Sequence, residues 1–103
     1  MTDFVTVARV GELLPGQARQ VTVHDRWVGL FNIAGRYYAI DNLCLHRGGP
    51  LNEGAVSGTV VTCPWHGWQF DVPTGACVQD PVVGVTRHEV RVVGDEIQVA
   101  LTD

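Results

Sequence analysis

The chain has 103 residues, 46% of them hydrophobic, and a formal net charge of −4 at pH 7. This length suits one domain, and the acidic balance argues against a nucleic-acid partner. No apolar run approaches the ~20 residues of a membrane span, and the N-terminus lacks the basic and apolar regions of a secretory signal. We therefore expect a cytoplasmic protein that does not bind membranes.

Strand signals run along most of the chain, as β-branched or alternating segments bounded by turn residues. The predicted strands are Val5–Val10, Ala18–His24, Trp27–Ala34, Tyr37–Asp41, Val60–Thr62, Gln69–Val72, Arg87–Val93 and Glu96–Leu101. Gly35-Arg36 and Gly94-Asp95 predict hairpin turns, and Val10–Leu14 predicts at most one helical turn. In the last hairpin, alternation predicts five inward side chains: Val90, Val92, Ile97, Val99 and Leu101. The pattern indicates an all-β sandwich or barrel.

Two Cys/His pairs interrupt this pattern, Cys44-Leu45-His46 and Cys63-Pro64-Trp65-His66. Each pair combines a thiolate with an imidazole at short spacing, within a segment rich in glycine and proline. Together they offer two sulfur and two nitrogen ligands to a metal centre.

Two kinds of centre suit this donor set. A structural Zn²⁺ accepts two Cys and two His, although zinc fingers usually keep the two Cys on one knuckle and the two His on a helix. An Fe₂S₂ cluster can instead place both Cys on one iron and both His on the other. The residues alone leave both possibilities open.

The segments C-L-H-R-G-G-P-L (44–51) and C-P-W-H-G-W-Q-F (63–70), followed by T-G (74–75), resemble the two cluster-binding loops of the Rieske [2Fe–2S] family. The resemblance implies an antiparallel β sandwich or barrel with an inserted cluster-binding subdomain. Its base would comprise residues 1–41 and 80–103, and the insertion residues 42–79. It also implies one [2Fe–2S] cluster with four ligands, namely Cys44, His46, Cys63 and His66. It implies no catalytic residue.

The resemblance further predicts a low reduction potential within the Rieske range of about −150 to +300 mV. High-potential members carry an extra Cys in each loop, where this chain has Gly49 and Trp65. They also place Ser and Tyr hydroxyls near the cluster sulfurs, where this chain has Trp68 and Phe70. Fewer hydrogen bonds to sulfur leave the reduced, more negative state less stabilised.

The function implied is electron transfer. No glycine fingerprint for NAD or FAD follows a strand, so electrons would come from a separate NAD(P)H-dependent flavoprotein reductase. The chain resembles ferredoxins of multicomponent aromatic-ring dioxygenases, which pass electrons to a terminal oxygenase, and we expect a monomer. One alternative is the small subunit of an NAD(P)H nitrite reductase, which works with a sirohaem subunit. Another is a structural zinc-binding module.

The remaining candidate residues have less specific roles. We expect Cys77 to be a small buried hydrophobe, and His24 and His88 to be surface or hydrogen-bonded histidines outside the ligand set. Trp65 and Trp68 are expected to pack over the cluster. Arg47 either contacts a partner or pairs with Glu53.

Overall fold

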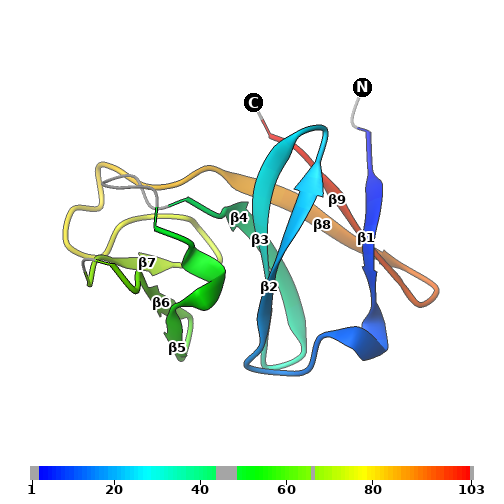
Figure 1. The fold of residues 1–103 in the computed structure, drawn as a ribbon, viewed down its shortest axis with the longest axis horizontal. Helices are drawn as coiled ribbons and strands as arrows, with labels where there is room; N and C mark the ends of the chain where they lie inside the picture. Colours follow the sequence, from blue (N-terminus) through cyan, green and yellow to red (C-terminus); the bar gives the residue numbers. More distant parts are fainter. Residues whose placement is uncertain (1–2, 44–48, 66, 103) are drawn as a thin grey trace.

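The computed structural model describes residues 3–43, 49–65 and 67–102 of the chain. Its strands form two antiparallel sheets (Figure 1), which confirms the all-β prediction. The larger sheet has the order β1-β9-β8-β4-β3-β2, with β1 (Val5–Arg9), β2 (Ala18–Val23), β3 (Arg26–Ile33), β4 (Arg36–Asp41), β8 (Arg87–Val93) and β9 (Glu96–Ala100). The smaller sheet contains β5 (Ala55–Ser57), β6 (Val60–Thr62) and β7 (Gln69–Asp71). Two short 3₁₀ turns are η1 (Val10–Glu12) and η2 (Leu51–Glu53).

The larger sheet curls into a nearly closed barrel because β1 and β2, at the two ends of its strand order, contact each other. Tight turns join its hairpins. The β2–β3 turn uses His24 and Asp25, with φ of 47° and 68°, and the β3–β4 turn uses Ala34 and Gly35, with φ of 53° and 90°. Two consecutive positive φ values match the twist of the adjoining strands. The turn predicted at Gly35-Arg36 therefore lies one residue earlier, and Arg36 begins β4.

Strands β3 and β4 are buried on both faces, and this explains the nearly continuous apolar segment in β3. One face packs in the barrel core, where Val28, Leu30 and Ala39 lie with residues of β2 and β9. The other face carries Phe31 and Ile40, which pack against the smaller sheet and its loops. The two cores of the molecule thus lie on opposite sides of the same two strands.

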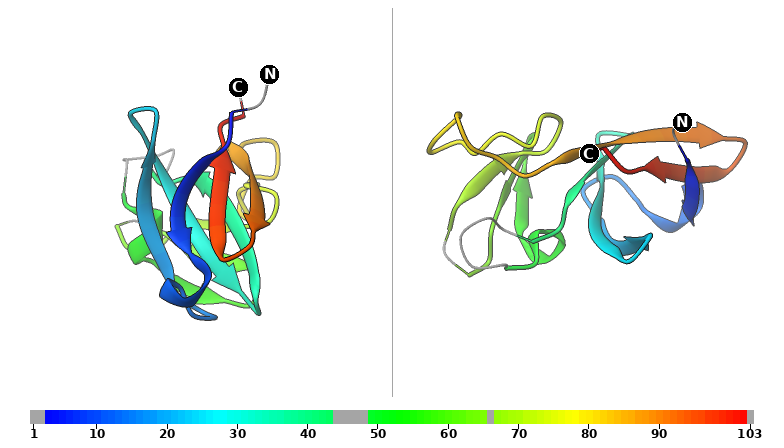
Figure 2. Two further views of the ribbon diagram at one scale, coloured as in Figure 1. Left: turned by 90° about the vertical axis from the view of Figure 1, so that its right-hand side faces the viewer. Right: turned by 90° about the horizontal axis from the view of Figure 1, so that it is seen from above.

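The smaller sheet and its connecting loops form a lobe beside the barrel, which we call the cluster lobe (residues 49–85, as far as described). Figure 2 shows the lobe and barrel side by side when seen from above. Seven buried side chains of the lobe join Phe31 and Ile40 in one core: Leu51, Val61, Cys63, Phe70, Val72, Cys77 and Val85. The core of the lobe is thus completed by side chains of β3 and β4.

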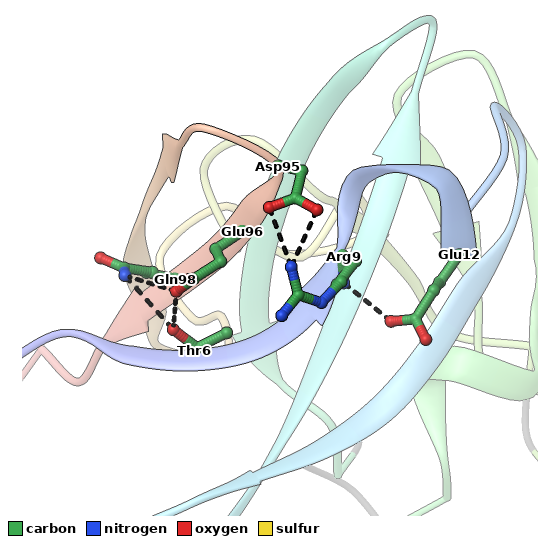
Figure 3. A network of polar contacts seen from close by, with 6 residues as sticks. All are labelled: Thr6, Arg9, Glu12, Asp95, Glu96 and Gln98. Atoms are coloured by element: carbon green, nitrogen blue, oxygen red, sulfur yellow. Dashed lines mark hydrogen bonds and ion pairs between the residues drawn. The ribbon is translucent and has the colours of Figure 1, made fainter.

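A polar network on the barrel surface joins β1 to the β8–β9 hairpin (Figure 3). The Arg9 guanidinium donates to both carboxylate oxygens of Asp95 at 2.9 and 2.8 Å, and the hydrogen bond to this carboxylate raises the pKa of Arg9. Thr6 Oγ1 donates to Glu96 Oε1 at 2.6 Å and Gln98 Nε2 donates to the same oxygen at 3.2 Å. These two hydrogen bonds, that of Thr6 first, lower the pKa of Glu96.

Most predicted strands match the observed ones to within one residue at each end. Strand β5 and the turn η2 were not predicted, because three residues are too few to show a periodicity. Of the five side chains predicted to point inward, Val92 is wrong, since it is 47% exposed. Strands β4 and β8 pair only at Ala39–His88 and Ile40–Arg87, so the barrel is open beside Val92.

Within the described ranges, no helix is long and apolar enough to cross a membrane.

Candidate metal centre

Of the four predicted ligands, Cys63 lies within the described part of the chain, and Cys44, His46 and His66 lie outside it. Arg47, predicted either to contact a partner or to pair with Glu53, also lies outside the described residues. The described residues therefore include one predicted ligand and the segments that flank the other three.

Cys63 follows β6 directly and is 1% exposed. Its backbone N–H donates to the carbonyl of Trp68 at 2.7 Å, and its carbonyl accepts from the Gly67 N–H at 3.0 Å. Gly67 has a φ of 74°, a conformation that glycine adopts without the strain of other residues. These bonds close a tight turn between β6 and β7, and hold the thiol of Cys63 in the lobe core.

The end of the first Cys/His loop packs against this turn. A Cβ atom built on Gly49 would lie 2.7 Å from Cys63 Sγ and 3.1 Å from Cγ of Trp65. Real side chains do not approach so closely, so a glycine is needed here to bring the two loops together. The spacing of the motif predicts that the loops converge, and the contact between Gly49 and Cys63 confirms it for the described residues.

The first loop is closed at its base. Leu43 and Pro50 form an antiparallel bridge, and the N–H of Leu51 donates to the carbonyl of Asn42 at 2.7 Å. The segment that contains Cys44 and His46 therefore leaves the barrel and returns to the lobe at neighbouring points.

A third loop follows β7 and returns the chain to the barrel. The Cys77 N–H donates to the Val83 carbonyl at 3.0 Å, and the Val85 N–H donates to the Gly75 carbonyl at 2.8 Å. Gly75 and Gly84 touch so closely that a Cβ on either would meet backbone atoms of the other strand of this loop. At its tip Val82 is 92% exposed.

The residues predicted to lie outside the ligand set differ in burial. Cys77 is buried in the lobe core, as predicted, and its Sγ lies 3.6 Å from Gln79 Oε1. Trp68 is half-buried against the same core, whereas Trp65 is 59% exposed. His24 is an exposed residue near Asp3.

His88 is the hydrogen-bonded histidine that was expected, and its setting is more specific than the sequence indicates. It is buried, its Nε2 lies 2.7 Å from Asp41 Oδ1, and its Nδ1 accepts the N–H of Thr102 at 3.0 Å. Because Nδ1 accepts, the ring proton is on Nε2 and is donated to Asp41. Arg26 also donates to both oxygens of Asp41, at 2.9 and 3.0 Å. No signal in the sequence links these three residues.

These features fit an iron–sulfur centre. A buried thiol lies beside a glycine that admits close approach, and the two loops that carry the Cys/His pairs meet at this point. Among the described residues, no three Cys, His, Asp or Glu side chains form another metal site. The donor set itself still suits either metal centre named above.

Comparison with known proteins decides between them. Residues 3–99 match the Rieske [2Fe–2S] domain family. The chain belongs to the Rieske [2Fe–2S] family. Its cofactor is accordingly a [2Fe–2S] cluster, and the structural zinc site is no longer favoured.

Several relatives of this Rieske chain are ferredoxins. It is 32% identical, over 99% of its length and 100% of the relative's, to the ferredoxin component of the naphthalene 1,2-dioxygenase system of Pseudomonas aeruginosa. It is 31% identical to a chain in a solved complex of reduced oxygenase and oxidised ferredoxin of carbazole 1,9a-dioxygenase, with a TM-score of 0.86 over 94% of this chain and 92% of that one. It also resembles a structure described as the small subunit of an NADH-dependent nitrite reductase from Mycobacterium tuberculosis, at 28% identity and a TM-score of 0.92 over 100% and 98% of the two chains.

Proposed function

We propose that this Rieske chain carries single electrons from an NAD(P)H-dependent flavoprotein reductase to the terminal oxygenase of a ring-hydroxylating dioxygenase system. The observation that carries the proposal is the similarity to a dioxygenase ferredoxin component over nearly the full length of both chains. In such a role the chain makes and breaks no substrate bond, and its work is to hold the cluster and meet two partners. We propose a monomer in the cytoplasm.

The proposed ligands are Cys44 and Cys63 on one iron and His46 and His66 on the other, within a cluster-binding subdomain of residues 42–79. When bound, a [2Fe–2S] cluster accepts and releases one electron. Burial of Cys63 keeps water from its thiolate, and Gly49 leaves the space that the sulfur atoms require. The imidazoles of His46 and His66 each have a second nitrogen that can hold a proton, so we propose a midpoint potential that falls with pH at high pH.

The exposed end of the cluster lobe is the proposed contact surface for both partners. Trp65, next to the ligand His66 in sequence, is 59% exposed, and Val82 at the tip of the third loop is 92% exposed. Aromatic side chains are enriched in surfaces that bind another protein. Electron transfer also requires the cluster to come close to its partner, and this end of the molecule carries both Cys/His loops.

The decisive experiment is an EPR spectrum of the purified protein before and after reduction by dithionite, together with its visible spectrum. A red-brown protein that gains a rhombic signal with a low average g on reduction supports the proposed ligands. His46→Ala and His66→Ala should each bleach or destabilise the cluster. A wild-type spectrum in either variant contradicts the ligand assignment, and a colourless protein with stoichiometric zinc contradicts the proposed function.

The direction of electron flow has its own test. The dithionite-reduced protein is mixed with the terminal oxygenase of a naphthalene dioxygenase system in a stopped-flow instrument. We expect rapid reoxidation of the ferredoxin that slows when Trp65 or Val82 is replaced by Asp. The variant Val93→Asp is the matched control, because Val93 is also half-exposed but lies at the far end of β8 in the barrel. Equal slowing in all three variants contradicts docking through the lobe.

A second candidate function is the small subunit of a nitrite reductase, favoured by the similarity to the mycobacterial structure. This function predicts tight copurification with a larger sirohaem subunit and no electron transfer to a dioxygenase. Affinity purification of the chain from the cells that produce it separates the two functions.

We also propose a midpoint potential near the lower end of the Rieske range. Phe70 is fully buried in the lobe core and carries no hydroxyl, and Gly49 and Trp65 exclude the disulfide of high-potential members. Trp68→Ser should raise the potential if the new hydroxyl reaches a cluster sulfur. Redox titration of both proteins measures the change, and a wild-type value near the upper limit of about +300 mV contradicts the proposal.

A further inference from the structure

Asn42 is a buried polar residue in an unusual place. The described residues contain three buried polar or charged side chains, namely Asn32, Asn42 and His88, and Asn42 is the most deeply buried of them. It follows β4 directly and stands two positions before Cys44. Burying an amide is costly unless its hydrogen bonds are made, so its partners indicate why it is kept.

Three of these hydrogen bonds cross the base of the first Cys/His loop. The Asn42 carbonyl accepts the Leu51 N–H at 2.7 Å, and its side-chain Oδ1 accepts the Asn52 N–H at 2.8 Å. Its Nδ2 donates to Asn52 Oδ1 at 2.7 Å. The residue that precedes the loop is thus bonded to the two residues that follow it. Leu43 and Pro50 form a bridge just inside this clasp.

The same residue attaches the loop to the barrel. Its Nδ2 donates to Gln20 Oε1 of β2 at 2.8 Å, and its backbone N–H donates to the Trp27 carbonyl of β3 at 3.1 Å. One amide side chain therefore holds together the barrel, the start of the loop and its return into η2.

Gly29 on β3 is independent evidence that the fold makes room for the Asn42 side chain. A Cβ atom on Gly29 would lie 2.7 Å from Asn42 Oδ1 and 2.9 Å from Phe31 Cε1. Its φ is outside the left-handed region, so the backbone does not require glycine here. The missing side chain instead provides the space that the Asn42 amide occupies.

We propose that Asn42 is the positioning residue of the first cluster-binding loop. By clasping the two ends of segment 43–50 and fixing them to β2 and β3, it restricts where Cys44 and His46 can lie. Fixing the ends of a loop removes much of its conformational freedom, and ligands held in place retain and tune a metal centre better than mobile ones. This inference rests on the ligand set of the proposed function, and it adds a residue that acts through the loop.

The test compares Asn42→Ala with Asn32→Ala. Asn32 is a matched control, since it is 3% exposed and its amide also bonds backbone groups, the Leu13 carbonyl at 2.8 Å and the Gly35 N–H at 2.9 Å. Those partners lie in the barrel, away from the Cys/His loops. Both variants should unfold at lower urea concentration than the wild type, because each leaves buried polar groups without partners.

Only Asn42→Ala should change the cluster. We expect shifted or broadened EPR g values in the reduced protein. Cluster loss in the presence of a chelator should be about tenfold faster, because the three hydrogen bonds made by the Asn42 side chain are lost. Hydrogen–deuterium exchange should speed up in residues 49–54 and stay unchanged in β3. Wild-type g values, cluster lifetime and exchange in Asn42→Ala would overturn the proposal and leave Asn42 with a purely structural role.

Gly29→Ala is the second variant, because it crowds the Asn42 amide without removing it. We expect the same changes in smaller degree, and this variant decides the matter if Asn42→Ala does not fold. A wild-type protein that shows no [2Fe–2S] signal would overturn the proposed function instead. In that event the exchange of residues 49–54 still decides whether Asn42 clasps the loop.

Discussion

The barrel and the cluster lobe are built in different ways. Barrel strands have five to eight residues, and the side chains that they turn toward the barrel interior form an apolar core. Lobe strands have three residues each, and the lobe depends on glycines in tight contacts, on turns and on the polar clasp of Asn42. The comparison shows that turns and close contacts can determine the fold of a region whose strands are too short to determine it.

The largest expected effect distinguishes two cysteines in the same lobe core. Cys63 and Cys77 are each 1% exposed, so Cys63→Ala and Cys77→Ala remove the same atoms from similar surroundings. Cys63→Ala should abolish cluster binding, measured as iron, labile sulfide and EPR signal per chain. Cys77→Ala should keep the cluster and lose on the order of 1 kcal/mol of stability. Cluster loss in both variants would mean that packing of the lobe, and not ligation, determines cluster retention.

Next in size are truncations in the two cores. Phe70→Ala in the lobe should lower the free energy of unfolding by about 3–5 kcal/mol, and Leu30→Ala in the barrel by about 2–5 kcal/mol. Both side chains are fully buried. The rate of cluster loss is then compared at urea concentrations where the two variants have the same free energy of unfolding. Phe70→Ala should lose its cluster faster than Leu30→Ala, because it loosens the sheet that precedes Cys63. Equal rates of cluster loss would show that the two cores act as one unit.

A smaller effect separates two glycines at positive φ. Gly94 in the β8–β9 turn has a φ of 62° and open space around it, so Gly94→Ala should cost about 1–2 kcal/mol from backbone strain alone. Gly75 has a φ of 81°, and a Cβ there would also collide with the Val85 carbonyl. Gly75→Ala should therefore cost more than Gly94→Ala in thermal or urea unfolding. The reverse order would indicate that the lobe adapts more easily than the barrel.

The smallest expected effect is a pH dependence confined to the barrel. The pKa of Glu96 is lowered in the folded protein, mainly by the Thr6 hydroxyl. The resulting stabilisation is complete above the unfolded pKa of about 4.5 and is lost as pH falls through the lower folded pKa. Urea midpoints measured from pH 6 to pH 3 should fall less steeply in Thr6→Val than in the wild type. Identical slopes would exclude this hydrogen bond as a source of acid sensitivity.

The barrel can be predicted from the sequence because strands such as β8 and β9 are long enough for alternation to show. The surroundings of each side chain cannot be predicted in the same way. Val92 is exposed because β4 and β8 stop pairing beyond Ala39 and His88, on the side of β8 that carries Val92. In the lobe the situation is reversed. Strand β5 has no recognisable pattern, yet the two Cys/His pairs predict a metal centre from their spacing, and the resemblance of their segments to Rieske loops predicts which kind.

The residues that support the site are harder to find in the sequence. An Asn after a strand is typical of a turn, and nothing in the sequence shows that Asn42 bonds residues on both sides of a loop. Asp41 and His88 are far apart in the chain and meet only because β4 and β8 pair. Such contacts depend on register and packing between distant segments, which local patterns do not contain.

The two buried faces of β3 and β4 also restrict how this chain can diverge. A larger or smaller side chain at Phe31 changes the lobe core, and a shift of the strand to accommodate it moves Leu30 in the barrel core. Substitutions in these strands must therefore satisfy two sets of neighbours at once. We expect sequence drift to concentrate in the outer strands, such as β1 and the solvent face of β8, while the two shared strands change slowly and together with their partners.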